Sequence, residues 1–180
     1  MRSVFLPIAL ALSMLVADPA HAMPDPADGE RFATERVEVA GLVKHPQSFD
    51  VAALEKLPAV TLENVTITGH NGHVMRRIGT LTGVKLSTLL DAAYIKVREP
   101  EDVKKMAIVV SASDGYKAVF SWNELFNSPA GDAVVLGYAV DGKAIGKEEG
   151  RLMLISAHDK RTGPRHVRWV KRVEVLKITD

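Results

Sequence analysis

The 180-residue chain contains no cysteine, and this absence strongly constrains both its fold and its chemistry. Without thiols, a chain cannot use disulfides, a cysteine-ligated zinc ion or an iron–sulfur cluster to stabilise a small fold. Burial of apolar side chains therefore has to hold it together. Apolar residues make up 47% of the sequence and charged residues 25%, an ordinary composition for one globular domain. The net charge of +1 gives no argument for nucleic acid or a membrane surface as a partner.

The start of the chain has the three parts of a secretory signal peptide. Arg2 supplies a positive charge, Val4 to Val16 is an apolar stretch, and Ala20 and Ala22 present small side chains to a signal peptidase. The apolar stretch is shorter than the roughly 20 residues that span a bilayer. We therefore expect residues 1–22 to be a signal peptide, 23–33 a flexible lead-in, and 34–180 a single domain. The product is expected to be soluble and periplasmic, without membrane insertion.

In the remainder of the chain, alternation of apolar and polar residues predicts the strands at 36–43, 60–68 and 166–178, and a continuous apolar run predicts the one at 106–112. Further strands are expected at 116–120, 133–140 and 151–156. Shorter stretches with helical spacing are expected at 49–57, 87–94 and 122–126. The last of these helices begins at a capping box formed by Ser121 and Glu124, and the polar segment from Gly69 to Gly79 is expected to be a loop. We predict an α+β fold with short helices around a mostly β, barrel-like core of mixed sheet.

Several short motifs follow one another in an order that is more specific than any single motif. They are Val37-x-Val39-x-Gly41-x-Val43, Thr82–Leu90, Ser113-Asp114-Gly115-Tyr116, Ser121–Leu125, Gly150–Ile155 and Arg165–Val170. In this order the chain resembles the molybdopterin-binding domain of the sulfite oxidase superfamily, over roughly residues 36–178. The resemblance implies an α+β fold that holds a pterin or molybdopterin in a cleft lined by loops.

The resemblance also identifies what this chain lacks. In the enzymes of the family a cysteine thiolate ligates molybdenum, and the segment that would carry it is Thr68 to Leu81 here. His70 or His73 cannot replace a soft thiolate without changing the metal chemistry. Short, exported members of the same fold hold a free, reduced pterin without molybdenum and contact a membrane protein that makes or degrades cyclic di-GMP. The resemblance therefore implies a periplasmic, non-catalytic pterin-binding protein that regulates such a cyclic di-GMP enzyme through its periplasmic domain.

Two other functions stay open. One is a molybdenum-cofactor-dependent oxidoreductase that uses molybdopterin with a non-cysteine metal ligand. The other is an interaction module that binds no ligand. The chain has no phosphate-binding loop, nucleophile elbow or dinucleotide-binding glycine motif, so hydrolase and nucleotide-binding functions have no support. His70 and His73 have a metal-like spacing, but they have no carboxylate nearby and flank Gly72, so no metal site is expected.

A pterin needs a stacking face, acceptors for its N–H groups and donors for its ring carbonyl. Seven side chains are candidates for these roles: Asp114, Tyr116, Trp122, His158, Arg161, Arg165 and Trp169. For the two tryptophans the alternatives are a stacking face or the hydrophobic core.

The polar candidates have structural alternatives as well. Arg161 and Arg165 lie in a cationic loop and either bind the ligand with their rigid donor forks or stay solvated. His158 is a ligand donor or a turn residue beside Asp159. Asp114 is a cleft carboxylate or part of a plain hairpin turn.

Overall fold

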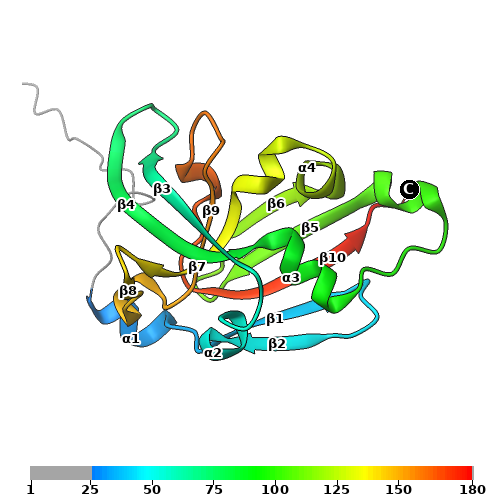
Figure 1. The fold of residues 1–180 in the computed structure, drawn as a ribbon, viewed down its shortest axis with the longest axis horizontal. Helices are drawn as coiled ribbons and strands as arrows, with labels where there is room; N and C mark the ends of the chain where they lie inside the picture. Colours follow the sequence, from blue (N-terminus) through cyan, green and yellow to red (C-terminus); the bar gives the residue numbers. More distant parts are fainter. Residues whose placement is uncertain (1–25, 180) are drawn as a thin grey trace, which may run out of the picture.

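The computed structural model describes residues 26–179, which form two five-stranded sheets (Figure 1). The first sheet has the order β2-β1-β10-β5-β6, in which β1 and β10 are parallel and the other neighbours antiparallel. Its strands are β1 (Arg36–Gly41), β2 (Gln47–Asp50), β5 (Met106–Ala112), β6 (Lys117–Ser121) and β10 (Val170–Lys177). Strand β1 lies near the start of the described chain and β10 near its end. Their parallel pairing therefore brings the two ends of the domain together in one sheet.

The second sheet is antiparallel and has the order β3-β4-β7-β8, with β9 also paired to β7. Its strands are β3 (Ala59–Thr68), β4 (Val74–Lys85), β7 (Val134–Val140), β8 (Lys143–Ala144) and β9 (Met153–Ser156). The predicted α+β class is confirmed. The β core consists of two open sheets rather than a closed barrel, because β3 and β6 each remain at a sheet edge.

Short helices connect the strands, and one of them lies between the sheets. The α-helices are α1 (Pro26–Phe32), α2 (Val51–Leu54), α3 (Leu86–Ala93) and α4 (Trp122–Phe126). The 3₁₀ helices are η2 (Pro100–Lys105), η3 (Pro129–Ala133), η4 (Lys147–Glu149) and η5 (Gly163–Arg165). Helix α3 contacts β1 of the first sheet and both β4 and β7 of the second. Within residues 26–179, no helix is long and apolar enough to cross a membrane.

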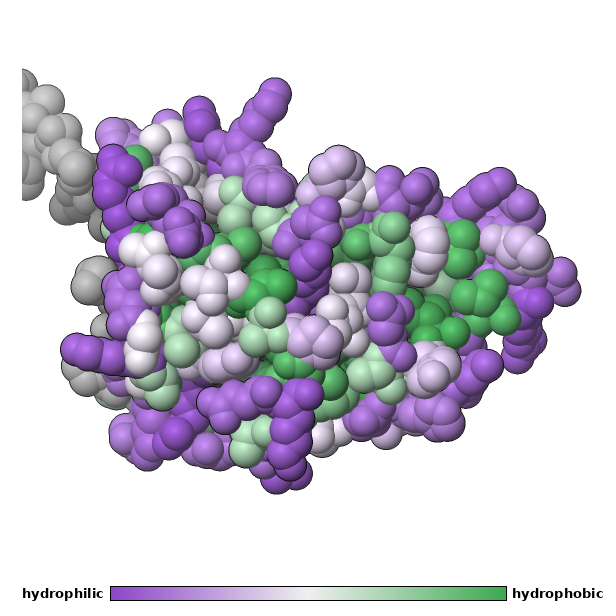
Figure 2. All heavy atoms as spheres, in the orientation of Figure 1, coloured by the Kyte–Doolittle hydropathy of each residue, from purple (hydrophilic) through white to green (hydrophobic). Residues whose placement is uncertain are grey.

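Two hydrophobic clusters form the core. The larger one fills the space around α3, where Leu86, Leu89 and Leu90 are fully buried. The smaller one packs the β3–β4 hairpin against β9 through Val65, Ile67, Ile78, Leu81, Ile145, Met153 and Ile155. The face shown in Figure 2 is mostly polar, with apolar side chains in separate patches. Such scattered exposure is normal for a globular domain.

The lead-in differs from the sequence-based expectation. Residues 26–32 form helix α1 instead of a flexible segment. The ring of Phe32 packs against Trp169 with its centroid 5.5 Å away, and the Phe32 carbonyl accepts a hydrogen bond from the Ser113 hydroxyl. These contacts, together with an ion pair between Glu30 and Lys147, hold a segment whose prolines and lack of periodicity predicted flexibility. The expected signal peptide, residues 1–22, lies outside the described residues.

The expected loop over residues 69–79 is also shorter than predicted. Only residues 69–73 turn, and β4 already begins at Val74. The tip of this hairpin projects beyond the core, and Val74, Met75 and Arg77 are all exposed. Its strands therefore need no apolar alternation, which is the signal that strand prediction depends on.

Trp169 is a core residue. Its side chain is only 2% exposed, and its indole N–H donates to the carbonyl of Lys147 over 3.3 Å. Phe32 packs on the ring, and the Arg168 guanidinium lies 4.6 Å from its centroid. The chain's own residues therefore cover the ring, and Trp169 is not free to act as a stacking platform.

We predict that Trp169→Ala lowers the free energy of unfolding by about 3–5 kcal/mol, the usual cost of removing a large buried aromatic side chain. Trp169→Phe keeps an apolar ring and should lose less than half of that. Urea unfolding of the two variants and the parent measures the difference. A loss below about 1 kcal/mol in Trp169→Ala would contradict the burial described here.

Candidate functional site

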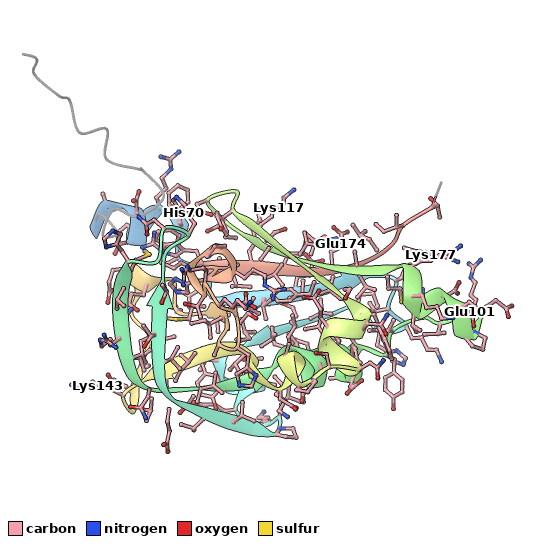
Figure 3. All side chains as sticks on the ribbon, turned by 90° about the horizontal axis from the view of Figure 1, so that it is seen from above. His70, Glu101, Lys117, Lys143, Glu174 and Lys177 are labelled. Atoms are coloured by element: carbon pink, nitrogen blue, oxygen red, sulfur yellow. The ribbon has the colours of Figure 1, made fainter. Side chains whose placement is uncertain are left out.

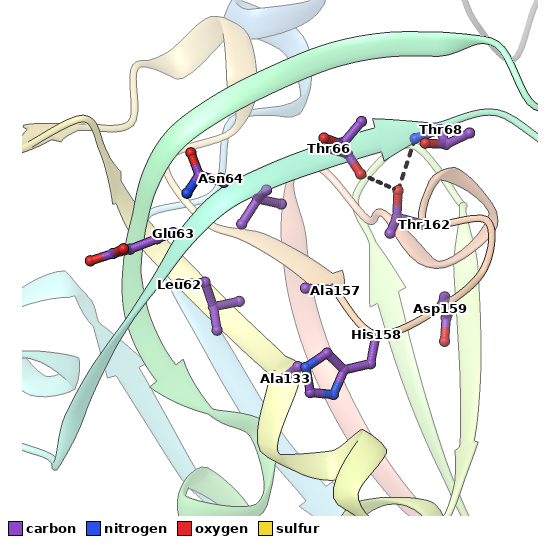
Figure 4. Close-up of a pocket in the computed structure, with 11 residues that line it drawn as sticks. Leu62, Glu63, Asn64, Thr66, Thr68, Ala133, Ala157, His158, Asp159 and Thr162 are labelled. Atoms are coloured by element: carbon purple, nitrogen blue, oxygen red, sulfur yellow. Dashed lines mark hydrogen bonds between the residues drawn. The ribbon is translucent and has the colours of Figure 1, made fainter.

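A cleft of about 330 Å³ lies between the free edge of β3 and the loop that follows β9 (Figure 4). It is lined by Leu62, Glu63, Asn64, Val65, Thr66, Thr68, Ala133, Ala157, His158, Asp159 and Thr162. Its volume is at the lower end of the range of small-molecule sites, about 300–1,000 Å³. The lining combines apolar side chains with hydroxyl, amide, imidazole and carboxylate groups. The cleft can therefore accommodate a flat, polar heterocycle.

Thr162 joins the two walls of this cleft. Its hydroxyl donates to the Thr66 carbonyl over 2.7 Å and accepts from the Thr68 N–H over 2.8 Å (Figure 4). At this point of the β3 edge, the Thr162 hydroxyl makes the two backbone hydrogen bonds that a neighbouring strand would otherwise make. The next residue, Gly163, permits this approach, because a Cβ atom there would lie 2.8 Å from the Thr68 carbonyl oxygen.

The rest of the β3 edge faces the cleft. In an antiparallel strand, the N–H and C=O of one residue point to the same side. Since the Thr66 carbonyl bonds to Thr162, the Thr66 N–H also faces the edge. Two residues earlier, Asn64 adopts a left-handed conformation with φ of 54°, where the regular pairing with β4 is interrupted. The edge therefore offers backbone hydrogen-bonding groups to a ligand.

Arg165 holds the loop wall of the cleft through two carboxylates. Its Nε and Nη2 donate to both carboxylate oxygens of Asp159, over 2.7 and 2.5 Å, and its Nη1 donates to Glu124 over 2.9 Å. The guanidinium also lies 4.5 Å from the centre of the Phe120 ring. This bidentate, stacked geometry is specific to arginine. The predicted ligand donor Arg165 therefore positions Asp159, which itself lines the cleft.

The contacts with Arg165 lower the pKa values of both carboxyl groups, Asp159 and Glu124. Burial alone would raise the pKa of Asp159, but hydrogen bonds from Arg165 and Ser156 outweigh it and lower that pKa. Burial likewise acts to raise the pKa of Glu124, and hydrogen bonds from Ser121 and Arg165 lower it. The same contacts raise the pKa of Arg165. All three groups are charged at neutral pH, so the cluster is an ion-pair network.

Replacing Arg165 should destabilise the fold. We expect Arg165→Met to lower the free energy of unfolding by about 1.5–3 kcal/mol at pH 7, because two partly buried carboxylates lose a charged partner. Arg161→Met is a matched control from the same loop. Arg161 is exposed, and within residues 26–179 its side chain donates only to the adjacent Lys160 carbonyl, so its change should stay within about 0.5 kcal/mol.

The effect of Arg165→Met should depend on pH. Carboxyl groups with a lowered pKa stabilise the folded state above their unfolded-state pKa of about 4, and the contribution is lost as the pH falls further. The difference between parent and Arg165→Met in urea unfolding should therefore shrink between pH 4 and pH 2. A difference that stays constant over this range would show that the network is not electrostatic.

Three other predicted site residues lie in or beside the same loop, outside the lining of the cleft. The Tyr116 hydroxyl donates to the Pro164 carbonyl over 2.9 Å, while its ring stays 42% exposed. Asp114 accepts from the Tyr116 N–H over 2.9 Å, in the hairpin turn between β5 and β6. Arg161 lies over the turn at the tip of the β3–β4 hairpin, where a Cβ on Gly72 would be 3.2 Å from its Nη2. These residues surround the loop, but they do not line the cleft.

The remaining two candidates lie on different parts of the molecule. His158 lines the cleft, and its Nδ1 is 3.3 Å from the Pro129 carbonyl oxygen. The Trp122 ring stacks on Phe126 with a centroid distance of 4.9 Å and packs against the larger core cluster. Of the seven predicted residues, His158 alone lines the cleft directly, and Arg165 acts on it through Asp159.

The sequence analysis missed the hydroxyl groups at the cleft. Thr66 lay there only within an expected strand, Thr68 marked the start of the segment that carries the cysteine in the family's enzymes, and Thr162 was not singled out. No local signal marks them, because their role depends on the edge of β3 meeting a loop almost one hundred residues later, at a separation of 96 for Thr66 and Thr162. Asp159 was noted only as a neighbour of His158.

A further titratable group, the half-buried His166, directly follows η5 in the cationic loop. Its Nε2 is buried and has no hydrogen-bond partner among the described residues. Burial, followed by the charges of Arg168 and Arg76, lowers the pKa of His166 to about 4. The imidazole is therefore neutral at physiological pH and adds no charge to the site.

Comparison with known proteins identifies the class of fold. The oxidoreductase molybdopterin binding domain family matches residues 22–179, so the chain belongs to this family. A solved structure, the sulfane dehydrogenase SoxCD from Paracoccus pantotrophus, superimposes with a TM-score of 0.58 at 25% sequence identity. The match covers 78% of this chain and 37% of the SoxCD chain, so the present chain spans well under half of that enzyme's length. No curated protein sequence matches the chain.

The donor set of the cleft differs from that of a thiolate-ligated molybdenum centre. The sequence contains no cysteine. Among residues 26–179, no three histidine, aspartate or glutamate side chains lie close enough together to hold a metal ion. The cleft does present hydrogen-bonding groups suited to the organic, heterocyclic part of such a cofactor. The residues present therefore fit a pterin, and they do not fit thiolate-bound molybdenum.

Proposed function

We propose that this protein is a periplasmic, non-catalytic pterin-binding protein that regulates a membrane cyclic di-GMP enzyme through its periplasmic domain. The ligand is a reduced pterin without molybdenum, held in the cleft between β3 and the loop after β9. The observation that carries the proposal is a molybdopterin-binding fold whose cleft offers donors and acceptors for a heterocycle but no thiolate for the metal.

The pyrimidine edge of a pterin suits the β3 wall. This edge carries a ring carbonyl, an N–H and an amino group side by side, much like the polar edge of a peptide chain. The Thr66 N–H can donate to the ring carbonyl. Asp159 uses three acceptor positions for Arg165 and Ser156, and a carboxylate has about four. Its remaining position can accept from a pterin N–H.

The apolar part of the lining supplies the rest of the site. Leu62, Val65 and Ala157 contribute apolar surface to the cleft, and an aromatic heterocycle gains affinity when such surface excludes water. His158, at the mouth of the cleft, completes the set of polar contacts.

A regulator must bind its partner differently with and without its ligand. The ion-pair network supports such a role, because it extends away from the cleft. Asp159 bonds to Arg165, Arg165 to Glu124, and Glu124 to the backbone N–H of Ser121 at the end of β6. A ligand that bonds to the remaining acceptor position of Asp159 therefore acts on a chain of contacts that reaches an exposed sheet edge. The expected signal peptide would bring the protein to the compartment of a periplasmic partner domain.

The first test of the proposal is the composition of the purified protein. Produced in cells that make the molybdenum cofactor, the protein should contain less than one tenth of an equivalent of molybdenum by mass spectrometry. A denatured and oxidised extract should show pterin fluorescence. Stoichiometric molybdenum would instead support the alternative, a molybdenum-cofactor-dependent oxidoreductase. Absence of both, together with failure to bind added pterin, would support a ligand-free interaction module.

The second test locates the ligand. We expect His158→Ala to weaken binding of tetrahydrobiopterin about 3- to 10-fold, the loss of one hydrogen bond. His73→Ala is the control, since His73 is exposed in the hairpin turn and does not line the cleft. Equilibrium titration of both variants measures the effect. Equal affinities in His158→Ala and the parent, or an equal loss in His73→Ala, would place the ligand elsewhere.

A further inference from the structure

Strand β6 leaves one of its backbone edges unpaired. It lies at the end of the first sheet and pairs only with β5. Ala112 donates to the Tyr116 carbonyl at the hairpin end, so by alternation Lys117, Val119 and Ser121 direct their N–H and C=O groups away from β5. The Ser121 N–H confirms this direction, because it donates outward to Glu124. Within the described chain, no hydrogen bond from another element to the outward groups of Lys117 and Val119 is present.

The side chains beside this edge form an apolar surface. Val119 is 55% exposed, and Leu176 and Ile178, at and just beyond the end of β10 on the other side of β5, are 39% and 61% exposed. They belong to the outer face of the first sheet, where Val119 pairs with Val109 and Leu176 with Ala107. A groove of about 640 Å³ runs over this end of the sheet, between Val119 and Ile178.

Lysines surround the groove. Lys104, Lys105 and Lys177 line it, and Lys117 lies at the other end of β6. Figure 3 labels Lys117 and Lys177, which lie toward opposite ends of the first sheet, and Lys177 bonds to the Asp102 carboxylate of η2. Lys104 and Lys177 are paired with Glu101 and Asp102. No ion pair of Lys105 or Lys117 occurs among the described residues. Lys105 therefore gives the groove lining an excess positive charge, and Lys117 adds another at the far end of β6.

We propose that the outer edge of β6 is a docking site for an extended, acidic segment of a partner protein. An added strand would pair with the outward N–H and C=O groups of Lys117 and Val119. Apolar side chains of that strand would pack beside Val119 and Ile178. Acidic side chains on the same face would meet Lys105 and Lys117. Exposed sheet edges are normally covered by another segment or carry several charged residues, prolines or bulges that prevent pairing with another chain. Strand β6 has a single charged residue, Lys117, and so lacks most of this protection.

The charge of the groove selects an acidic partner over a second copy of this chain. Antiparallel pairing of two β6 strands would bring Lys117 of one copy toward the end of β6 in the other copy, beside Lys104 and Lys105. Like charges would then face each other across the interface, which is unfavourable. An acidic segment meets the same lysines with the opposite charge.

The β6 edge would be the surface through which the proposed regulator contacts its partner. Only this biological role rests on the proposed function. Docking itself is tested on the purified full chain without added pterin, so failure of pterin binding leaves the result independent. The probe is the capped peptide acetyl-TETVTET-amide, which places two glutamates and a valine on one face of a strand. The control peptide carries lysine in place of both glutamates.

The expected result is a set of amide NMR shifts centred on residues 117–121, with slowed hydrogen exchange at the Lys117 and Val119 amides. The lysine peptide should bind at least fivefold more weakly. Val119→Pro removes one outward N–H without breaking the ladder to β5 and should weaken binding about fivefold. Lys105→Glu tests the charge without touching the strand, and Lys143→Glu, on the exposed β8, is its matched control.

Shifts centred on another surface would overturn the proposal. Equal binding of the two peptides would do the same, as would undiminished binding in both Val119→Pro and Lys105→Glu. Sedimentation that shows a dimer dissociated by Val119→Pro, without peptide binding, would assign the edge to a second copy of the chain and also overturn it.

Discussion

The bidentate ion pair between Arg165 and Asp159 is the interaction on which the candidate site depends. It holds the loop after β9 against the rest of the fold, and it fixes a carboxylate at the wall of the cleft. Arg165 forms a second ion pair with Glu124, whose side chain is held in place by the capping box at the start of α4. A helix cap, an arginine and a cleft carboxylate therefore form one connected unit. Such a unit orders a loop more firmly than hydrogen bonds from solvated side chains would.

The cleft exists because the second sheet stays open. Strand β3 has only one neighbour, β4, and the loop after β9 approaches its free edge without forming a ladder. Thr162 makes the one pair of strand-like contacts between the two walls. The remaining edge groups of β3 face a space lined by His158 and Asp159. An open edge of this kind can offer backbone donors and acceptors to a flat polar ligand, so the side chains need not be specialised.

The sequence predicted the elements that rest on local patterns. Alternation located β1 and β3, a continuous apolar run located β5, and the Ser121–Glu124 spacing located the start of α4. The same spacing could not reveal the second role of Glu124, since its bond to Arg165 joins residues 41 positions apart. The two interpretations of Trp169 could not be separated either, because Phe32, which covers its ring, lies in a segment without periodicity. Contacts between distant segments, rather than weak local signals, account for what was missed.

A crystal structure of the protein with a bound reduced pterin tests the central claim most directly. The account predicts density for the pterin in the cleft between β3 and residues 157–162. Its pyrimidine edge should lie within hydrogen-bond distance of the Thr66 N–H and the Asp159 carboxylate, with the Arg165–Asp159 pair retained. A pterin bound elsewhere on the protein would contradict the account, as would a complex in which molybdenum is coordinated at the cleft.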